Sequence, residues 1–212
     1  QSANGIVNAS IIKAGFNKDL APYIQLSEKI GRLHSQLLKN QLLKINITCS
    51  GELLSSSISI LTSSLLKGFL KERRTETINI VNALLLAREM GIDITEKSTV
   101  SNEVYKNLLT VECITSKGTK TIAGTVFGNN EIRIVQIDEY HLELKPVGNL
   151  IFYTNIDKPG MLATVGKILA AANINIGGLS LGRIEAGKQA LTIVNIDSEL
   201  EPVVIQTISS IS

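Results

Sequence analysis

The pattern of apolar and polar positions divides the chain into helical and strand-like stretches. Steps of three and four separate the apolar residues of its first regular stretch, which are Tyr23, Leu26, Ile30, Leu33 and Leu37. This spacing predicts a helix, with Pro22 in a first turn where a missing N–H costs nothing. Gly31 costs the helix about 1 kcal/mol relative to alanine, which predicts a close approach by another element.

The next stretches change period twice. Polar and apolar residues alternate over Leu43–Ser50, which predicts a half-buried strand. A second alternation through Ser55–Ser57 is interpreted as a strand or strand approach. Helical spacing then returns over Leu61–Glu72. The charge run Lys71–Arg74 is interpreted as the solvated end of that helix.

From Leu108 to Lys145 the pattern is purely that of strands. Before it, Ile80–Met90 has helical spacing and ends at Gly91, and Ile92 begins a short strand. From there on, alternating stretches joined by tight turns predict an antiparallel meander. Its four strands are expected at Leu109–Ser116, Thr119–Phe127, Glu131–Ile137 and Tyr140–Lys145. The short, stiff segment Pro146–Gly148 is the predicted boundary between two domains.

The order strand, helix, strand, strand, helix follows this boundary. It is the order of a ferredoxin-like unit that lacks its final strand. The first strand breaks at Asp157–Gly160, where Asp157 is expected to cap the helix and Pro159 to lie in its first turn. The remaining elements are expected at Ile176–Glu185, at Ala190–Asp197 and from Glu199 onward.

These elements together predict an α+β fold with two domains. Residues 1–16 are polar and are expected to tether the chain to an upstream part, since the sequence opens on Gln1 without a methionine. Residues 17–146 are expected to form an α/β domain around an antiparallel sheet. Residues 149–212 are expected to form the ferredoxin-like domain. A chain of 212 residues is long enough for each domain to bury a core.

Composition excludes several classes of function. The net charge is only +2, and there are four Tyr, four Phe and no Trp, so nothing favours a nucleic-acid partner. The apolar runs are too short to span a bilayer, and a soluble protein is expected. Cys49 and Cys113 are isolated in strand-like runs and are expected to be buried free thiols. No cluster of Cys and His provides a metal site, and His34 and His141 are expected at the surface.

Polar residues around the strand–helix unit at residues 149–178 are the candidates for binding chemistry. Asn155 and Asp157 leave its first strand and Asn175 enters its second, and all three are expected to gather at one end. The backbone N–H groups near the helix start belong to Gly160, Met161 and Leu162. Such an end could hold a small molecule with an amine and a carboxylate. The alternative is that Asp157 only caps the helix and the asparagines satisfy turn backbone.

Sequence motifs give these positions a context. The run N-I-D-K-P-G-M-L-A followed by I-N-I resembles an ACT domain, a small regulatory module that binds amino acids. Four further runs carry a resemblance that is wider than the ACT domain. They are A-P-Y-I-Q-L-S-E-K-I-G-R-L at Ala21–Leu33, A-G-T-V-F-G at Ala123–Gly128, R-I-V-Q-I-D at Arg133–Asp138 and L-S-L-G-R-I-E-A-G-K-Q-A-L-T-I-V-N-I-D at Leu179–Asp197. From about Val7 to its end, the chain resembles the C-terminal part of long-form D-3-phosphoglycerate dehydrogenases, an intervening domain followed by an ACT domain.

The resemblance implies a regulatory, non-catalytic fragment. Its parent enzyme would oxidise 3-phosphoglycerate with NAD in the first step of L-serine biosynthesis. L-serine would bind as feedback effector between the ACT domains of a homo-oligomer, contacting Asn155, Asp157 and Asn175. No catalytic residue and no cofactor are expected in the fragment, because it lacks a glycine-rich strand-to-helix turn for a dinucleotide. A cytoplasmic location is expected, or a plastid if the parent carries a transit peptide.

The resemblance also implies an anion-binding site in the intervening domain. Arg133 and Lys145 match positions where basic residues hold a phosphate or another anion in some members of the family. They are expected on consecutive strands, where the odd-length connection Asp138–Tyr140 would put both side chains on one face. Two facing cations repel each other, and an anion between them would relieve that repulsion. The alternative is that both are solvated surface cations.

Assembly and two rival functions complete the expectations. The strand at Ile174–Ser180 is expected to be an open edge that pairs with a second copy. One rival is the matching part of an iron–sulfur L-serine dehydratase, against which the absence of a cysteine triad counts. The other rival is a purely structural oligomerisation module that has lost its ligand.

Overall fold

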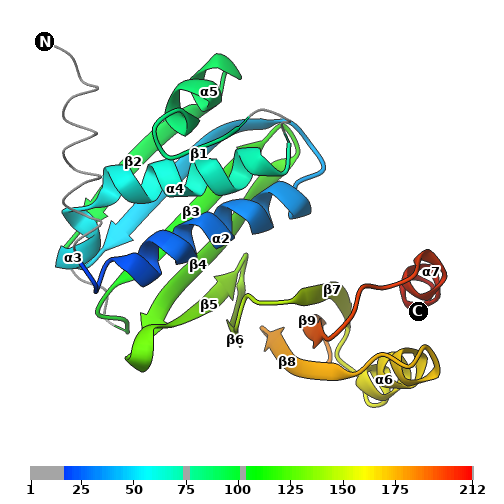
Figure 1. The fold of residues 1–212 in the computed structure, drawn as a ribbon. Coiled ribbons are helices and arrows are strands. Elements are labelled where there is room, and N and C mark those ends of the chain that lie inside the picture. The colour runs from blue at the N-terminus through cyan, green and yellow to red at the C-terminus, as the bar shows by residue number, and fades with distance from the viewer. Residues whose placement is uncertain (1–16, 74–76, 101–103, 212) are drawn as a thin grey trace, which may run out of the picture. The chain divides into compact units, whose positions relative to one another are not determined.

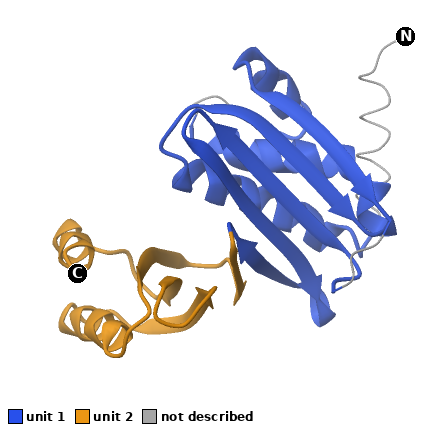
Figure 2. Ribbon diagram, turned by 180° about the vertical axis from the view of Figure 1, so that it is seen from behind, with its two compact units in different colours: residues 1–138 blue, residues 139–212 orange. Residues whose placement is uncertain are grey.

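The computed structural model describes residues 17–73, 77–100 and 104–211 and divides the chain into two compact units (Figure 2). Unit 1 is residues 1–138 and unit 2 is residues 139–212. The expected tether, residues 1–16, and Arg74 of the charge run lie outside the described residues. The Pro146–Gly148 segment lies within unit 2, between two strands, and its role as a domain boundary stays a prediction.

Unit 1 alternates helices and strands and then becomes entirely β. Its helices are α2 (Ala21–Leu37), α3 (Glu52–Ser55), α4 (Ile58–Lys71), α5 (Ala83–Glu89) and the short 3₁₀ helix η1 (Gly128–Asn130). Its strands are β1 (Leu42–Ser50), β2 (Asp93–Thr99), β3 (Leu108–Thr115), β4 (Gly118–Phe127) and β5 (Glu131–Ile137). Each predicted helix of unit 1 and each strand of the predicted meander there is present, so the α+β prediction is confirmed.

The strands of unit 1 form one sheet in the order β2-β1-β3-β4-β5. β1 runs parallel to β2 and antiparallel to β3, and β3, β4 and β5 continue as antiparallel neighbours. The tight connections of the sequence therefore make the meander that they predict. One face of the sheet is covered by α2 and α4 (Figure 1).

The core of unit 1 lies between this sheet face and the two helices. The fully buried side chains that fill it include Leu26, Ile30, Ile45, Ile47, Leu61, Leu65, Leu109, Val111, Ile122 and Ile134. Cys49 and Cys113 are also buried on these strands as free thiols, as predicted. Burial raises the pKa of each thiol to about 12, so both remain protonated and unreactive at neutral pH.

Helices α2 and α4 touch through their backbones at two glycines. A Cβ added at Gly31 would lie 2.0 Å from the carbonyl oxygen of Leu65, and one added at Gly68 would lie 2.0 Å from that of Glu28. The close approach predicted from Gly31 is confirmed, and Gly68 makes the reciprocal contact. Because neither backbone has room for a side chain, the two helices pack more closely than larger residues would allow.

Polar contacts flank the glycine contact. The Ser27 hydroxyl donates a hydrogen bond to the Leu61 carbonyl at 2.6 Å, and Lys67 pairs with Glu28 at 2.8 Å. Arg73, beyond the end of α4, donates to the Ser35 hydroxyl and carbonyl at 3.0 and 2.9 Å. These contacts fix the relative position of the two helices along their length.

The interpretation of Ser55–Ser57 as a strand is wrong. Ser55 ends α3 and Ser57 directly precedes α4, so the segment is a connection between helices. The Ser55 hydroxyl donates to the Thr99 carbonyl at 3.1 Å, and the Ser56 hydroxyl donates to the Leu53 carbonyl at 3.1 Å. Three serines in a row produce an apparent alternation with their apolar neighbours, but their hydroxyls satisfy turn backbone.

The placement of His34 at the surface is also wrong, whereas His141 is exposed as predicted. His34 lies four residues after Ile30, on the buried face of α2, and is 0% exposed. Among the described residues, neither ring nitrogen has a hydrogen bond of good geometry. Burial lowers the pKa of His34 from 6.5 to about 4, and Lys120 also lowers it, against opposite effects of the Val111 backbone and Asp138.

Unit 2 contains the strand–helix–strand–strand–helix order predicted for it. Its elements are β6 (Tyr140–Leu144), β7 (Asn149–Ile156), α6 (Met161–Ala171), β8 (Ile176–Arg183), β9 (Gln189–Ile196) and α7 (Pro202–Ser209). β7, β9 and β8 form an antiparallel sheet with β9 in the middle. Within the described residues no strand follows α7.

The core of unit 2 lies between this sheet and its two helices. Its buried residues are Val165, Leu169, Val194, Ile196, Val204 and Ile208. Ile151 and Tyr153 of β7 pack against them, which places odd-numbered residues of β7 on the helix side. On the other face, β6 contacts β8, and the Ser180 hydroxyl donates to the Glu143 carbonyl.

Replacing Gly31 with alanine is expected to destabilise unit 1 by about 1 to 3 kcal/mol, because the new methyl group would force α2 away from α4. Denaturant unfolding of the purified chain, followed by circular dichroism, measures the change. Gly166→Ala in α6 is the matched control, since nothing lies within 4 Å of the added Cβ. That control is expected to leave stability unchanged or to raise it. Equal stability of the Gly31→Ala chain and the wild type would contradict the packing argument.

Unit 1 is expected to lose stability in mild acid because of His34. In the unfolded chain His34 takes up a proton near pH 6.5, whereas in the folded chain it stays neutral down to about pH 4. The free energy of unfolding therefore has its full value above pH 6.5 and falls as the pH drops toward 4. The full loss is about 3 kcal/mol. Chemical denaturation between pH 4 and 7.5 measures the slope. His34→Gln is expected to flatten it, whereas His141→Gln, at an exposed position, is expected to leave it unchanged.

Candidate functional site

The turn between β7 and α6 carries most of the predicted site residues. α6 begins at Met161, and Gly160 precedes it with a backbone φ of +93°, which favours glycine. No side chain caps this helix, so the prediction that Asp157 caps it is wrong, as is the placement of Pro159 in the first turn. The left-handed Gly160 takes the capping position, and Asp157 lies four residues before the first helical residue.

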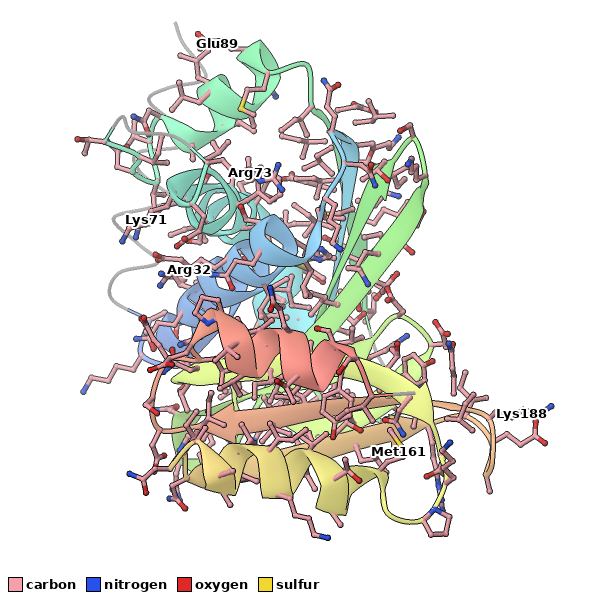
Figure 3. All side chains as sticks on the ribbon, turned by 90° about the vertical axis from the view of Figure 1, so that its right-hand side faces the viewer. Arg32, Lys71, Arg73, Glu89, Met161 and Lys188 are labelled. Atoms are coloured by element: carbon pink, nitrogen blue, oxygen red, sulfur yellow. The ribbon has the colours of Figure 1, made fainter. Side chains whose placement is uncertain are left out.

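Asp157 instead forms an ion pair with a neighbouring strand. Its carboxylate accepts a hydrogen bond from the Arg183 guanidinium at 2.9 Å. Arg183 is the last residue of β8. Its backbone N–H donates to the Lys188 carbonyl at 2.8 Å, which ties the turn to the β8–β9 connection. Met161 and Lys188 lie at the same end of unit 2 (Figure 3). A negative and a positive side chain therefore meet at the turn that leads into α6.

Asn155 lies next to this ion pair on the helix side of the sheet. Asn155 and Arg183 both align with Ala190 of β9, one from each neighbouring strand, so they share a face. The Asn155 amide nitrogen donates to the Ile156 carbonyl at 2.7 Å, and its oxygen accepts a hydrogen bond from Thr192 at 3.3 Å. Asn155, Asp157 and Arg183 thus converge at one end of the sheet.

Asn175 does not join this group, and the expectation that all three polar residues gather at one end is wrong. The Asn175 amide donates to the Asp197 carboxylate at 2.8 Å, beyond the far end of β9. Asn155 aligns with Ala190, and Ile176 aligns with Ile196, six residues further along β9. At about 3.4 Å per residue the two asparagines are roughly 20 Å apart. The cause is the crossover through α6, which returns the chain to the opposite end of the sheet before β8 begins.

A small pocket lies beside Asn155 in unit 2. Its volume is about 180 Å³, and β7, α6, α7 and the chain after α7 surround it. Met161 and Val165 line it from α6, and Ile208 lines it from α7. Burial raises the pKa of Tyr153 on its wall, and a hydrogen bond with Thr192 acts in the opposite sense. The residues that line it are mostly apolar, and neither Asp157 nor Arg183 is among them.

Two other predicted contact residues, Gly160 and Leu162, lie at the surface. Gly160 has open space where a Cβ would be, and Leu162 is 45% exposed on the first turn of α6. Both are therefore accessible to a small molecule or a second chain. The assignment of Asn155, Asp157, Gly160, Met161, Leu162 and Asn175 to effector binding stays a prediction.

The predicted anion residues fall in different units. Arg133 lies in β5 of unit 1, where its guanidinium pairs with Glu131 and donates to the Ile132 carbonyl at 3.0 Å. Lys145 is exposed directly after β6 of unit 2. The connection from β5 to β6 has two residues, Asp138 and Glu139, and not the odd number expected. It gives no support for a shared face, and anion binding by Arg133 and Lys145 stays a prediction.

The β5–β6 connection was mispredicted because Asp138 adopts a conformation that usually requires glycine. Its φ is +50°, and its carboxylate accepts hydrogen bonds from Lys120 at 2.6 Å and from the Thr121 N–H at 2.9 Å. These contacts hold a two-residue turn without glycine. In the described part of the chain, no group of three His, Cys, Asp or Glu side chains could hold a metal ion, and no helix is long and apolar enough to cross a membrane.

Two residues of this end were not predicted from the sequence. Arg183 ends a strand and Thr192 lies inside one, and neither position differs in sequence from an ordinary solvated or β-branched strand residue. Only the register of three strands brings them beside Asp157 and Asn155.

The fold and this site define a class of protein. It is a two-unit α+β chain whose second unit is ferredoxin-like and carries charged groups at a strand–helix turn. Comparison with known sequences matches the D-3-phosphoglycerate dehydrogenase intervening domain to residues 19–138 and the ACT domain to residues 148–212. The chain belongs to the D-3-phosphoglycerate dehydrogenase family and carries its intervening and ACT domains.

Individual relatives agree with this assignment. The chain is 32% identical to D-3-phosphoglycerate dehydrogenase of Bacillus subtilis, covering 100% of this chain and 41% of that protein. It is 34% identical to that of Archaeoglobus fulgidus, covering 97% and 39%, and 27% identical to the chloroplastic D-3-phosphoglycerate dehydrogenase 2 of Arabidopsis thaliana, covering 97% and 36%. The chain thus spans about two fifths of the length of these relatives.

Proposed function

We propose that this chain is the effector-binding part of a D-3-phosphoglycerate dehydrogenase and that it binds L-serine between two copies of unit 2. In this proposal the chain itself catalyses nothing. The parent enzyme oxidises 3-phosphoglycerate with NAD, in the cytoplasm or in a plastid, and the serine formed downstream restrains it. The observation that carries the proposal is that Asn155, Asp157 and Arg183 lie together at the end of the sheet from which the turn into α6 leaves.

The chemistry of this end suits an α-amino acid. The Asp157 carboxylate can accept hydrogen bonds from an ammonium group, and the Asn155 amide can bond a hydroxyl. The first N–H groups of α6 have no side-chain partner, and a helix start favours a carboxylate. The Asp157 side chain is 24% exposed, so a ligand can reach it while part of its surface is removed from water.

The position of Asn175 requires a second copy. It lies at the far end of the sheet, roughly 20 Å from Asn155. When two β8 strands pair antiparallel about a two-fold axis, the beginning of one strand lies beside the end of the other. Asn175 of the second copy would then approach Asp157 and Arg183 of the first. Each site would take its residues from both chains.

The surface of β8 supports such pairing. In unit 2, β8 hydrogen-bonds to β9 along only one of its edges. Three apolar side chains on its helix side are exposed, Ile176 by 38% and Leu179 and Leu181 by 46% each. An edge strand with apolar side chains tends to pair with another strand. A second copy would cover these side chains, and an effector bound across the pair would favour the paired state.

Among the rival functions, an L-serine dehydratase fits less well, because the intervening domain matched here is that of D-3-phosphoglycerate dehydrogenase. A structural module without a ligand makes a different prediction in solution. It would pair through β8 with no response to amino acids. Ligand titration therefore separates it from the proposal.

Isothermal titration of the chain with L-serine is expected to give heat, and L-serine is expected to raise the melting temperature. Asp157→Asn should weaken binding by about 10- to 100-fold, since it removes a charge-assisted hydrogen bond. Asp93→Asn is the matched control, because Asp93 pairs with Lys44 at 3.1 Å in unit 1. An absence of heat, together with an unchanged melting temperature, would sink the serine proposal.

Mixing two variants tests whether each site draws on two chains. Asn155→Ala and Asn175→Ala are each expected to bind L-serine about 10-fold more weakly or worse, because each damages every site of a homodimer. After mixing and re-equilibration, half of the sites in a mixed dimer contain both asparagines, so high-affinity binding should return in part. Titration before and after mixing measures this recovery. No recovery, despite demonstrated subunit exchange, would mean that each site lies within one chain.

A further inference from the structure

The ion pair of Asp157 and Arg183 presents two opposite charges in the arrangement that a zwitterion carries. The Arg183 nitrogen and the Asp157 oxygen are 2.9 Å apart, and Asp157 lies in the turn that leads into α6. We propose that Arg183 is a specificity-determining residue of the effector site. The carboxylate of a bound α-amino acid replaces Asp157 as the partner of the Arg183 guanidinium, and its ammonium group replaces Arg183 on Asp157. This inference rests on the proposed effector function.

The ion pair can open at little cost. The Arg183 side chain is 55% exposed, and exposed ion pairs contribute little to stability. Arg183 is the last residue of β8, so its long side chain can turn without disturbing the pairing of β8 with β9. Among the described residues, only one guanidinium nitrogen of Arg183 makes a hydrogen bond. The remaining N–H groups can hold a planar carboxylate through two parallel hydrogen bonds.

The surroundings keep the two charges in place for an inserted ligand. The Asp157 backbone is anchored to the Lys188 carbonyl at 2.8 Å, so the turn that carries this carboxylate stays in place when the pair opens. Ala190 lies between Asn155 and Arg183 in register on the sheet, and its side chain is fully buried.

A ligand with only one of the two charges would leave one partner of the opened pair unsatisfied. An amine without a carboxylate occupies Asp157 but gives Arg183 nothing in return. Specificity for amino acids over amines therefore arises from Arg183, together with the N–H groups at the start of α6, and not from Asp157. If Arg183 only held Asp157 in position, its loss would weaken ligands with and without a carboxylate to the same degree.

The test compares L-serine with L-serinamide, which keeps the ammonium and hydroxyl groups but has no carboxylate. Both are titrated calorimetrically into the wild-type chain, Arg183→Gln and Arg32→Gln. Arg32 is the matched control, because it pairs with Glu72 at 2.9 Å and its side chain is 48% exposed. Circular dichroism and melting temperature check that each variant folds. Arg183→Lys, which keeps the charge but not the planar fork, tests rescue.

The wild type and Arg32→Gln are expected to prefer L-serine over L-serinamide by at least about tenfold. In Arg183→Gln this preference should fall to about threefold or less, because L-serine alone loses affinity, and Arg183→Lys should recover part of it. An unchanged preference in Arg183→Gln, or equal weakening of both ligands, overturns the role of Arg183 while leaving the effector site standing. If L-serine fails to bind the wild-type chain at all, the proposed function fails and this inference fails with it.

Discussion

The direction of β8 relative to β7 is the constraint on which the proposed site depends. Both strands pair antiparallel with β9, so they run parallel to each other, and α6 must carry the chain back across the sheet between them. Residues that leave the first strand and residues that enter the second are therefore separated by the length of the sheet. Asn155 and Asn175 can contribute to one ligand only if symmetry brings two chains together.

Elements in which the hydrophobic pattern repeats over many residues were predicted correctly from the sequence. The prediction failed where the pattern extends over only a few residues. The steps of three and four in α2 and the alternation in β3, β4 and β5 extend over enough residues to exclude other structures. Ser55–Ser57 offers only three residues, and tertiary hydrogen bonds decide its conformation. His34 is polar, but the helical period that buries Ile30 buries it as well. Packing therefore overrides the polarity of a single residue.

The site was predictable only as far as it is local. Asn155 and Asp157 belong to one continuous motif, and their position at a strand–helix turn follows from the pattern of the chain. Arg183 reaches Asp157 from 26 residues away, which depends on the register of β7, β9 and β8. Register is set by side chains on both faces of a sheet and by bulges such as the one near Gly178. None of these can be read from the motif itself.

The reciprocal contact of Gly31 and Gly68 has a mechanical consequence for unit 1. Where two helices meet through side chains, small rotamer changes allow one to shear along the other. Here the carbonyl groups of Leu65 and Glu28 each face an opposing glycine, so a shear would drive backbone into backbone. The two helices should therefore translate together as one stiff layer above the sheet. Any conformational signal crossing unit 1 would have to tilt this layer as a whole.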